Sequence, residues 1–566
     1  MRRSLMAIAF VMSCGHIPPA STEGVPSPWP EARADAGNTP PTTPPPPPTR
    51  PPANPPRGPL PVTRTPGGAV IKQGTPPPVV PLGKPAPAPA SPAPTDDADR
   101  ATPPKGGPPP KLNLPVPARR KLKNGAALLV VERHELPMAS LVITWPTGIA
   151  DEPPAQAGIA GLTADLLDEG AGKRGALEVA EDVARLGATL STSASWDDTR
   201  VQVTALTRAL DPLLPIVADL VAHPTFADKE LDRVRADRIT GLVQLRDVPS
   251  MIAHDTLARV IYGDKERYGL PEIGTESSLK AIDRAAIVKW HAEHLRPDLA
   301  TVIVVGDVQP DDIARRLDAA FAGWTAKGKA RLKHATATAP RPMRRVVIVD
   351  RPGAAQTDMR LGLPGAPRKS KDYFACLVTN AILGGQFISR LNFNLREQHG
   401  YTYGARTEFT FRRNGGPFVA GAPVKTAVTE PSLKETLGEL SRIREADVAP
   451  EELGLAKDLL SRALAREFET PPQVAAALVA QVVEGLPDDY YKTYADRIAA
   501  VTAADVRKAA QRWIEPTKMT IVLVGDEKAI GDGVTTMVGE YERRGTDGIL
   551  LPSAGGGTGS ATSGER

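Results

Sequence analysis

The chain has 566 residues, of which 69 are basic and 65 acidic, and its formal net charge is +4. This length exceeds that of one compact domain, so we expect two or more domains. The small net charge and an aromatic content of 4% argue against a nucleic-acid-binding protein. The two cysteines, Cys14 and Cys376, imply no disulfide framework. Cys376 lies in an apolar helical pattern, and we expect it to pack in a core.

The N-terminus has the composition of a bacterial export signal. Two arginines at residues 2–3 precede a short apolar stretch at residues 4–12, which is too short to span a bilayer. Residues 11–14, Val-Met-Ser-Cys, resemble a lipobox, in which Cys14 becomes the lipidated first residue. Gly15 after the cysteine favours the outer membrane by analogy. We therefore expect an exported periplasmic lipoprotein, the alternative being an ordinary secretory signal with a chance cysteine.

A proline-rich segment follows the signal and precedes the folded body. Residues 15–118 are dominated by Pro, Ala, Thr and Gly, so they cannot bury enough apolar surface to fold. We expect an extended, polyproline-like tether between a membrane anchor and the globular part of the chain.

The rest of the chain carries helical and strand patterns that are grouped rather than strictly alternating. In the first half we expect strands at residues 126–132 and 140–146, helices at 159–169 and 177–186, a strand hairpin at 188–206, and helices at 209–221, 228–245 and 252–261. In the second half we expect strands at residues 345–349, 358–363 and 401–411, and helices at 370–383 and 389–397. Because helices and strands are grouped, the pattern favours an α+β fold with helices over a largely antiparallel sheet.

An internal repeat relates the two halves. Residues 282–307 read IDRAAIVKWHAEHLRPDLATVIVVGD, and residues 501–526 read VTAADVRKAAQRWIEPTKMTIVLVGD. The two segments align without a gap, and each has an amphipathic helix, a proline and a β-branched strand ending in Val-Gly-Asp. We therefore predict two homologous domains. The predicted boundaries are 1–14 for the signal and lipobox, 15–118 for the tether, 119–325 and 344–535 for the two domains, 326–343 for the linker and 536–566 for a partly disordered tail.

Three segments together carry a resemblance to a known family. Residues 383–406, LGGQFISRLNFNLREQHGYTYGAR, resemble the Leu-Gly-Gly, Ser-Arg-Leu, Leu-Arg-Glu and Gly-x-x-Tyr signature of peptidase family M16, the pitrilysin, insulinase and mitochondrial processing peptidase group. Residues 158–171, GIAGLTADLLDEGA, resemble its zinc helix, and residues 262–269 resemble its Tyr-x-x-His-Pro-Tyr-Gly stretch without the His-Pro. The resemblance implies two domains of the M16/LuxS-like metallohydrolase type.

The zinc motif of this family is absent. Active members carry His-x-x-Glu-His on a helix, where two imidazoles one turn apart reach one zinc and the glutamate takes the proton of its water. The corresponding residues here are Gly161, Ala164 and Asp165, and the third ligand falls near Thr240-Gly241. We therefore expect no metal in this chain.

Only one pair of histidines is clustered. His291 and His294 are three residues apart on a predicted helix and could share a face. Their repeat partners are Ala510 and Trp513, which favours a packing face over a metal site.

The arginine and the tyrosine that act opposite the zinc in this family have counterparts in the sequence. The resemblance implies that Arg396 and Tyr403 hydrogen-bond the carbonyl and the oxyanion of a substrate opposite the zinc, where preorganised donors stabilise developing charge. The alternative is that Arg396 pairs with an acid and Tyr403 packs as an ordinary strand aromatic. Gly384 and Gly385 either bring backbone close to the substrate or form a turn.

The resemblance implies a role in a two-chain enzyme. We expect a non-catalytic, peptide-binding subunit, inactive alone, that supplies Arg396 and Tyr403 to the zinc of a partner chain with the intact motif. An unfolded or extended peptide would bind by adding a strand to a sheet edge. The alternative is a scaffold or peptide-binding pseudo-enzyme with no proteolytic role.

Overall fold

This computed structural model describes residue 107 and residues 116–328, 334 and 343–552. The predicted signal with Cys14, most of the tether, part of the linker and the end of the tail lie outside the described residues. The chain divides into two units, Met1–Gly107 and Pro108–Arg566, and the helices and strands of the described residues all lie in the second. None of the helices in the described ranges is long and apolar enough to cross a membrane.

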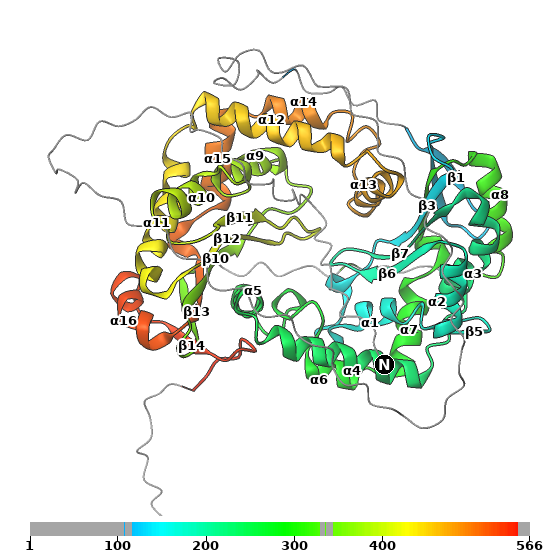
Figure 1. The fold of residues 1–566 in the computed structure, drawn as a ribbon, viewed down its shortest axis with the longest axis horizontal. Coiled ribbons are helices and arrows are strands. Elements are labelled where there is room, and N and C mark those ends of the chain that lie inside the picture. Colours follow the sequence, from blue (N-terminus) through cyan, green and yellow to red (C-terminus); the bar gives the residue numbers. More distant parts are fainter. Residues whose placement is uncertain (1–106, 108–115, 329–333, 335–342, 553–566) are drawn as a thin grey trace, which may run out of the picture. The chain divides into compact units, whose positions relative to one another are not determined.

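The first sheet has six strands in the order β1-β2-β8-β3-β7-β6. Figure 1 labels β1, β3, β7 and β6 of this sheet. Strands β2 and β8 run parallel and the other neighbours run antiparallel. The central strands carry continuous apolar runs, as expected for strands that are buried on both faces. The strands are β1 (Ala118–Lys121), β2 (Ala127–Glu132), β3 (Met138–Trp145), β6 (Thr189–Ala194), β7 (Thr199–Leu206) and β8 (Thr301–Gly306).

The second sheet repeats this order as β14-β9-β13-β10-β12-β11. Here β9 runs parallel to β13 and β14, and the other neighbours run antiparallel. Its strands are β9 (Arg345–Asp350), β10 (Gln356–Pro364), β11 (Arg406–Phe409), β12 (Pro417–Lys425), β13 (Thr520–Gly525) and β14 (Glu542–Arg544). The α+β fold class is confirmed, with sheets that are mixed.

Strands β8 and β13 confirm the internal repeat. Each lies third from one end of its six-stranded sheet. Each also ends at a glycine whose α-carbon is closely approached by atoms of a neighbouring segment. A Cβ on Gly306 would lie 2.2 Å from the carbonyl oxygen of Met138, and one on Gly525 would lie 2.6 Å from Oγ1 of Thr357. Neither position has room for a side chain, which accounts for the glycine in both Val-Gly-Asp sequences.

The helices before these strands begin at equivalent caps. Helix α7 (Arg284–His294) starts where Asp283 accepts a hydrogen bond from the Ala286 amide at 2.8 Å. Helix α15 (Ala503–Trp513) starts where Thr502 accepts one from the Asp505 amide at 3.2 Å. These caps satisfy amides that the first helical turn leaves unpaired.

Helices cover both sheets and form a hydrophobic core on each. The further helices of the first half are α1 (Ile159–Asp165), α2 (Ala176–Arg185), α3 (Leu210–Ala222), α4 (Asp228–Leu245), α5 (Pro249–Tyr262), α6 (Glu276–Ala281) and α8 (Pro310–Ala320). Those of the second half are α9 (Tyr373–Leu383), α10 (Arg390–Asn392), α11 (Thr429–Glu445), α12 (Pro450–Arg466), α13 (Pro471–Val483), α14 (Tyr494–Ala500) and α16 (Glu527–Val538). Two short strands, β4 (Gly170–Ala171) and β5 (Arg174–Gly175), form a separate hairpin.

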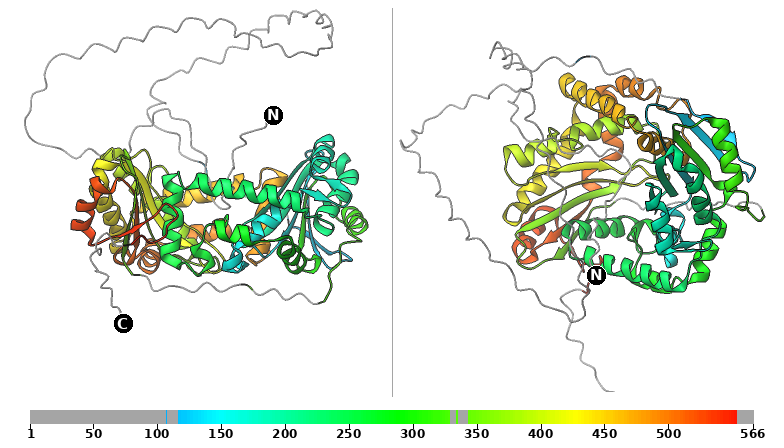
Figure 2. Two further views of the ribbon diagram at one scale, coloured as in Figure 1. Left: turned by 90° about the horizontal axis from the view of Figure 1, so that it is seen from below. Right: turned by 45° about the vertical axis from the view of Figure 1, so that its right-hand side comes forward.

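Two helices pack on the sheet of the other half. Helix α5 lies against β10 and β13, and α13 lies against β3 and β8 (Figure 1). Figure 2 shows the same ribbon from two further sides. Leu257 and Ile261 of α5 join Val347 in one buried cluster, and Val474 of α13 joins Ile303 in another. Each such buried aliphatic side chain contributes roughly 1.5–3 kcal/mol, so each half completes the core of the other.

Three predicted elements differ from the structure. The helix expected at residues 159–169 ends at Asp165, and the helix expected at 389–397 is α10 followed by a π-helix at Phe393–Gln398. The strand expected at residues 401–411 is only Arg406–Phe409, because the Ala405 amide donates instead to the side chain of Asn392. Strand β14 extends the second sheet beyond residue 535, the predicted end of the second domain.

Candidate functional site

The helix at the predicted zinc position is held from its N-terminus by a buried carboxylate. Glu152 accepts hydrogen bonds from the amides of Gly158 and Ala160 at 2.8 and 2.7 Å. The same carboxylate lies 2.6 Å from Nε of Arg267, and both side chains are almost fully buried. Gly158 adopts a φ of 98°, which favours glycine. This anchor fixes the start of α1, and no motif in the sequence indicates it.

An arginine fills the place where a metal-ligating side chain would begin. Arg238 of α4 donates from Nε to Oδ2 of Asp165 at 2.7 Å. A Cβ on Gly161 would lie 2.6 Å from Nη2 of Arg238 and 2.9 Å from Nη1. Ala164 is fully buried beside them. The guanidinium therefore packs directly over the backbone at the first vacated position.

These residues do not fit a zinc ion. The three vacated positions offer one carboxylate, Asp165, and Arg238 already pairs with it. The guanidinium is a permanent cation, and it would repel a metal held at the same place. No cluster of three or more His, Cys, Asp or Glu that could hold a metal occurs in the part of the chain that the structure describes.

Acidic side chains follow the end of α1. Glu169 pairs with Arg233, which also contacts Glu230 and Asp237 of its own helix. Burial, with Glu169 and Asp165 adding repulsion, raises the pKa of Asp168 from 3.8 to about 6. The charge of Asp168 therefore changes in the mildly acidic range.

Strand β6 borders this helix and has an open edge. It pairs with β7 alone and lies at the end of the first sheet, and α1 packs against it. Thr189, Ser191 and Ser193 are exposed, while the alternate residues are half-buried. Within the described ranges no backbone hydrogen bond joins its outer edge to another segment. Such an edge is a template for another strand.

Arg396 lies on the π-helix of the second half. Its guanidinium carbon is 4.3 Å from the ring centroid of Phe387, and its Nε is 3.6 Å from Oε1 of Glu397. Its Nη1 is buried without a hydrogen-bond partner. Single π-helical turns are frequent at functional sites, and an unpaired buried donor is costly unless a ligand satisfies it.

Tyr403 projects from a fixed loop and is 87% exposed. The loop is held where Thr402 donates to the Pro423 carbonyl at 2.5 Å and where Ala405 donates to Asn392 at 2.9 Å. Tyr403 therefore lies in a loop before β11, so the prediction that it lies on a strand is wrong. No hydrogen bond joins it to Arg396 within the described residues, so their joint action on a substrate stays a prediction.

An exposed apolar patch lies on the segment that carries Arg396. Phe387, Ile388 and Phe393 are 63%, 59% and 41% exposed, and they come from the segment that carries Arg396. Large exposed side chains grouped in this way mark an interaction surface more often than scattered ones do.

The two glycines of this segment have a packing role. A Cβ on Gly384 would lie 2.4 Å from the amide nitrogen of Thr407, and one on Gly385 would lie 2.6 Å from Nδ2 of Asn380. The Thr407 amide donates to the Gly384 carbonyl at 3.1 Å, which occupies part of the edge of β11. Close approach within the fold thus requires both glycines, and contact with a substrate stays a prediction.

The clustered histidines pack within the first half. His291 Nε2 lies 3.0 Å from the Val221 carbonyl oxygen, and burial lowers the pKa of its ring from 6.5 to about 4. His294 stacks on Trp290 with ring centroids 3.9 Å apart. The packing interpretation is confirmed, as it is for the buried Cys376.

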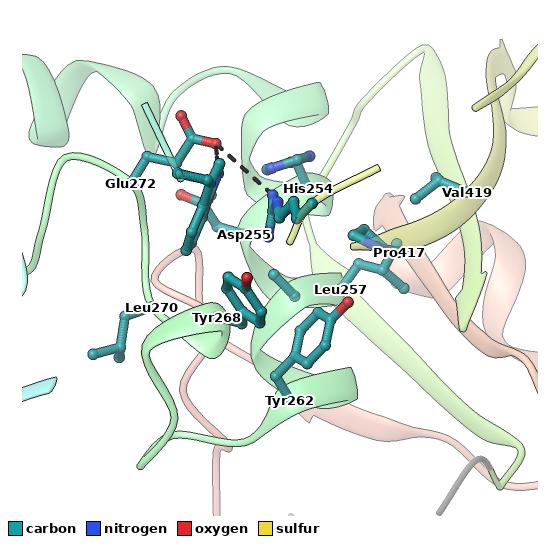
Figure 3. A pocket seen from close by; sticks show the side chains of 12 residues that line it. His254, Asp255, Leu257, Tyr262, Tyr268, Leu270, Glu272, Pro417 and Val419 are labelled. Carbon is teal, nitrogen blue, oxygen red and sulfur yellow. Dashed lines mark hydrogen bonds and ion pairs between the residues drawn. The ribbon is translucent and has the colours of Figure 1, made fainter. Parts of the chain in front are cut away.

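A small cavity of about 20 Å³ lies between α5 and β12 (Figure 3). Glu272 accepts from the indole of Trp196 and lies 4.0 Å from Arg412, whose guanidinium carbon is 3.8 Å from the Trp196 ring. The hydroxyls of Tyr262 and Tyr268 are buried without partners. A cavity of this size holds about one water, so it has no room for a peptide side chain.

Family models match both halves of the chain. Residues 128–266 match the insulinase (peptidase family M16) model, and residues 281–460 match the peptidase M16 inactive domain. The chain belongs to peptidase family M16. The expected family is confirmed.

M16 proteins of known structure share the fold. A peptidase M16 inactive domain from Pseudomonas fluorescens superposes with a TM-score of 0.67 at 26% identity, covering 72% of this chain and 98% of that one. A protease from Helicobacter pylori also superposes with a TM-score of 0.67, at 20% identity, covering 73% of this chain and 100% of that one. In sequence, the Helicobacter pylori "non-peptidase homolog YmxG" is 23% identical over 70% of this M16 chain and 91% of its own length. An uncharacterized zinc protease of Streptomyces coelicolor is 25% identical over 60% of this chain and 74% of its own length.

Proposed function

We propose that this chain is the non-catalytic, peptide-binding subunit of a two-chain M16 zinc peptidase. One observation carries the proposal: the Arg238–Asp165 ion pair stands where the metal ligands belong, while Arg396 and Tyr403 remain on an exposed segment. The inactive-domain match and the similarity to a non-peptidase homologue support a role without zinc of its own.

In this proposal the zinc belongs to a partner chain with the His-x-x-Glu-His motif. The exposed apolar patch around Phe387 would face that partner or its substrate. Arg396 and Tyr403 would donate hydrogen bonds to the substrate carbonyl and to the oxyanion that develops on it. The zinc of the partner would supply the activation of water. Such donors act strongly because they are already oriented before charge develops.

The peptide would lie along β6 of this chain. Its outer edge is open and its alternate side chains are small and polar, so backbone hydrogen bonds would supply most of the affinity. Binding of that kind selects extended peptides over folded proteins and is weakly dependent on sequence.

The test is reconstitution with a zinc-bearing M16 chain from the same source. Tyr403→Phe removes one hydroxyl, and Arg396→Lys keeps the charge but loses the planar fork. We expect either change to lower kcat/KM of the two-chain enzyme by roughly one to three orders of magnitude. Tyr401→Phe is the matched control, because Tyr401 stacks on His399 close to the same loop.

Unchanged kcat/KM in both variants would refute the role of the pair. A chain that binds extended peptides but raises the turnover of no zinc-bearing partner would instead favour the scaffold function.

We also propose export and lipid anchoring through Cys14 at the outer membrane. The basic and apolar segments before Cys14 support this, together with the proline-rich stretch that follows. Mass spectrometry of the mature N-terminus tests it. A diacylglyceryl-modified Cys14 is expected, and cleavage without lipid would contradict the anchor.

A further inference from the structure

Arg238 leaves most of its donors without a protein acceptor. Its Nε donates to Asp165 at 2.7 Å, and Asp165 is its only hydrogen-bond partner within the described ranges. A guanidinium also has N–H donors on both Nη atoms, and these lie against Gly161, which has no side chain to accept them. The Arg238 side chain is 15% exposed, so a ligand can reach it.

Helix α1 lies between this guanidinium and β6 in a chain of contacts. Arg238 packs over α1, and α1 packs against β6. A strand added to the outer edge of β6 would pass beside α1, with its carbonyl oxygens in the plane of the sheet. Asp165 holds Nε in place, so the fork is oriented before any ligand arrives and loses little freedom on binding.

We infer that Arg238 binds an oxygen of the bound peptide, a backbone carbonyl or a terminal carboxylate, at the place where active relatives hold a metal. This inference rests on the proposed peptide-binding function. The guanidinium would thus bind a substrate oxygen, as a metal can, but it would not activate a water molecule. A charge-assisted hydrogen bond to such an oxygen is among the stronger polar contacts in proteins.

The neighbouring charges favour the neutral carbonyl as the source of that oxygen. Asp165 already pairs with the Arg238 guanidinium at 2.7 Å, and its negative charge raises the cost of bringing in a second carboxylate there. A carbonyl from the middle of an extended peptide meets no such repulsion.

The experiment measures binding of a fluorescein-labelled oxidised insulin B chain, as free acid and as C-terminal amide, by fluorescence anisotropy. Arg238→Gln is expected to raise Kd about tenfold or more, since hydrogen bonds to charged groups are the ones most costly to lose. Arg238→Lys should recover part of the loss. Arg233→Gln is the matched control, because it removes the same charge from the same helix and should change Kd by less than about twofold.

A second variant keeps the arginine and moves it. In Gly161→Ala the new Cβ would lie 2.6 Å from Nη2, so the guanidinium must shift and binding should weaken although Arg238 is still present. This variant decides the question if Arg238→Gln fails to fold, which circular dichroism would report.

The two peptide forms separate the sources of the oxygen. Equal losses for acid and amide indicate the carbonyl, and a loss confined to the free acid indicates the terminal carboxylate. Wild-type binding that Arg238→Gln and Gly161→Ala leave unchanged would overturn the inference while the proposed function stands. Absence of wild-type binding to either form would overturn both.

Discussion

Gly161 and Arg238 share one space: a Cβ on the glycine would lie 2.6 Å from Nη2 of the arginine. The guanidinium from α4 can pack here because residue 161, at the first histidine position of the motif, is a glycine. Because Asp165 pairs with the same guanidinium, the vacated positions depend on one another.

The first prediction concerns repair of the zinc motif. The triple change Gly161→His, Ala164→Glu and Asp165→His is expected to give only weak zinc binding, because Arg238 stays in the space and loses its acid partner. Adding Arg238→Ala and Gly241→Glu removes the cation and supplies a third ligand, at a position where a Cβ meets only Ile273 at 3.7 Å. Isothermal titration should then show zinc affinity at least about tenfold higher.

Equal zinc affinity for the triple and the five-fold variant would contradict this view of Arg238. Circular dichroism of both variants is the control for folding.

The second prediction concerns Asp168. Its pKa is raised in the folded state from 3.8 to about 6, so the folded protein holds a proton that the unfolded chain has released. The free energy of unfolding should therefore fall as pH rises from about 4 to about 6, by at most about 3 kcal/mol from this group. Asp168→Asn should flatten that part of the pH profile in urea denaturation. An unchanged slope would show that Asp168 titrates normally.

The third prediction concerns the anchor of α1. Glu152→Gln leaves Arg267 buried without its charged partner and weakens the cap on Gly158 and Ala160. We expect the free energy of unfolding to drop by about 3–5 kcal/mol.

Glu178→Gln is the matched control, because Glu178 accepts from the Gly175 amide at 2.9 Å but at an exposed helix start. It should cost about 1 kcal/mol or less. Equal losses in the two variants, measured by urea denaturation, would contradict a special role for the buried pair.

The fourth prediction concerns the loop that carries Arg396. Gly384→Ala puts a Cβ 2.4 Å from the Thr407 amide, so the loop must move away from β11. We expect a loss of about 1–3 kcal/mol in stability, together with lower activity of the two-chain enzyme. Gly404→Ala, whose nearest neighbour would be Asn392 at 4.0 Å, should be tolerated in both measurements. A tolerated Gly384→Ala would remove the packing argument.

The regular elements could be predicted where periodicity and caps agree. Helix α4 has the predicted bounds, and the hairpin predicted at residues 188–206 is formed by β6 and β7. The start of the strand predicted at residues 401–411 could not be predicted. The Ala405 amide donates to the side chain of Asn392, 13 residues earlier, and no local sequence pattern indicates that contact.

The site was only half predictable from the sequence. The vacated positions and the retained Arg396 and Tyr403 follow from motifs, but the third-ligand position at Thr240-Gly241 gave no sign that Arg238 would fill the space. The packing of α5 and α13 on the opposite sheets was also hidden, since an apolar face predicts burial but not its partner.

The most direct test of the account is the zinc content and peptide turnover of the purified chain, alone and with its zinc-bearing partner. We predict less than stoichiometric zinc and no turnover for the chain alone, and turnover in the complex that depends on Tyr403. Tight stoichiometric zinc with turnover by the isolated chain would contradict the account.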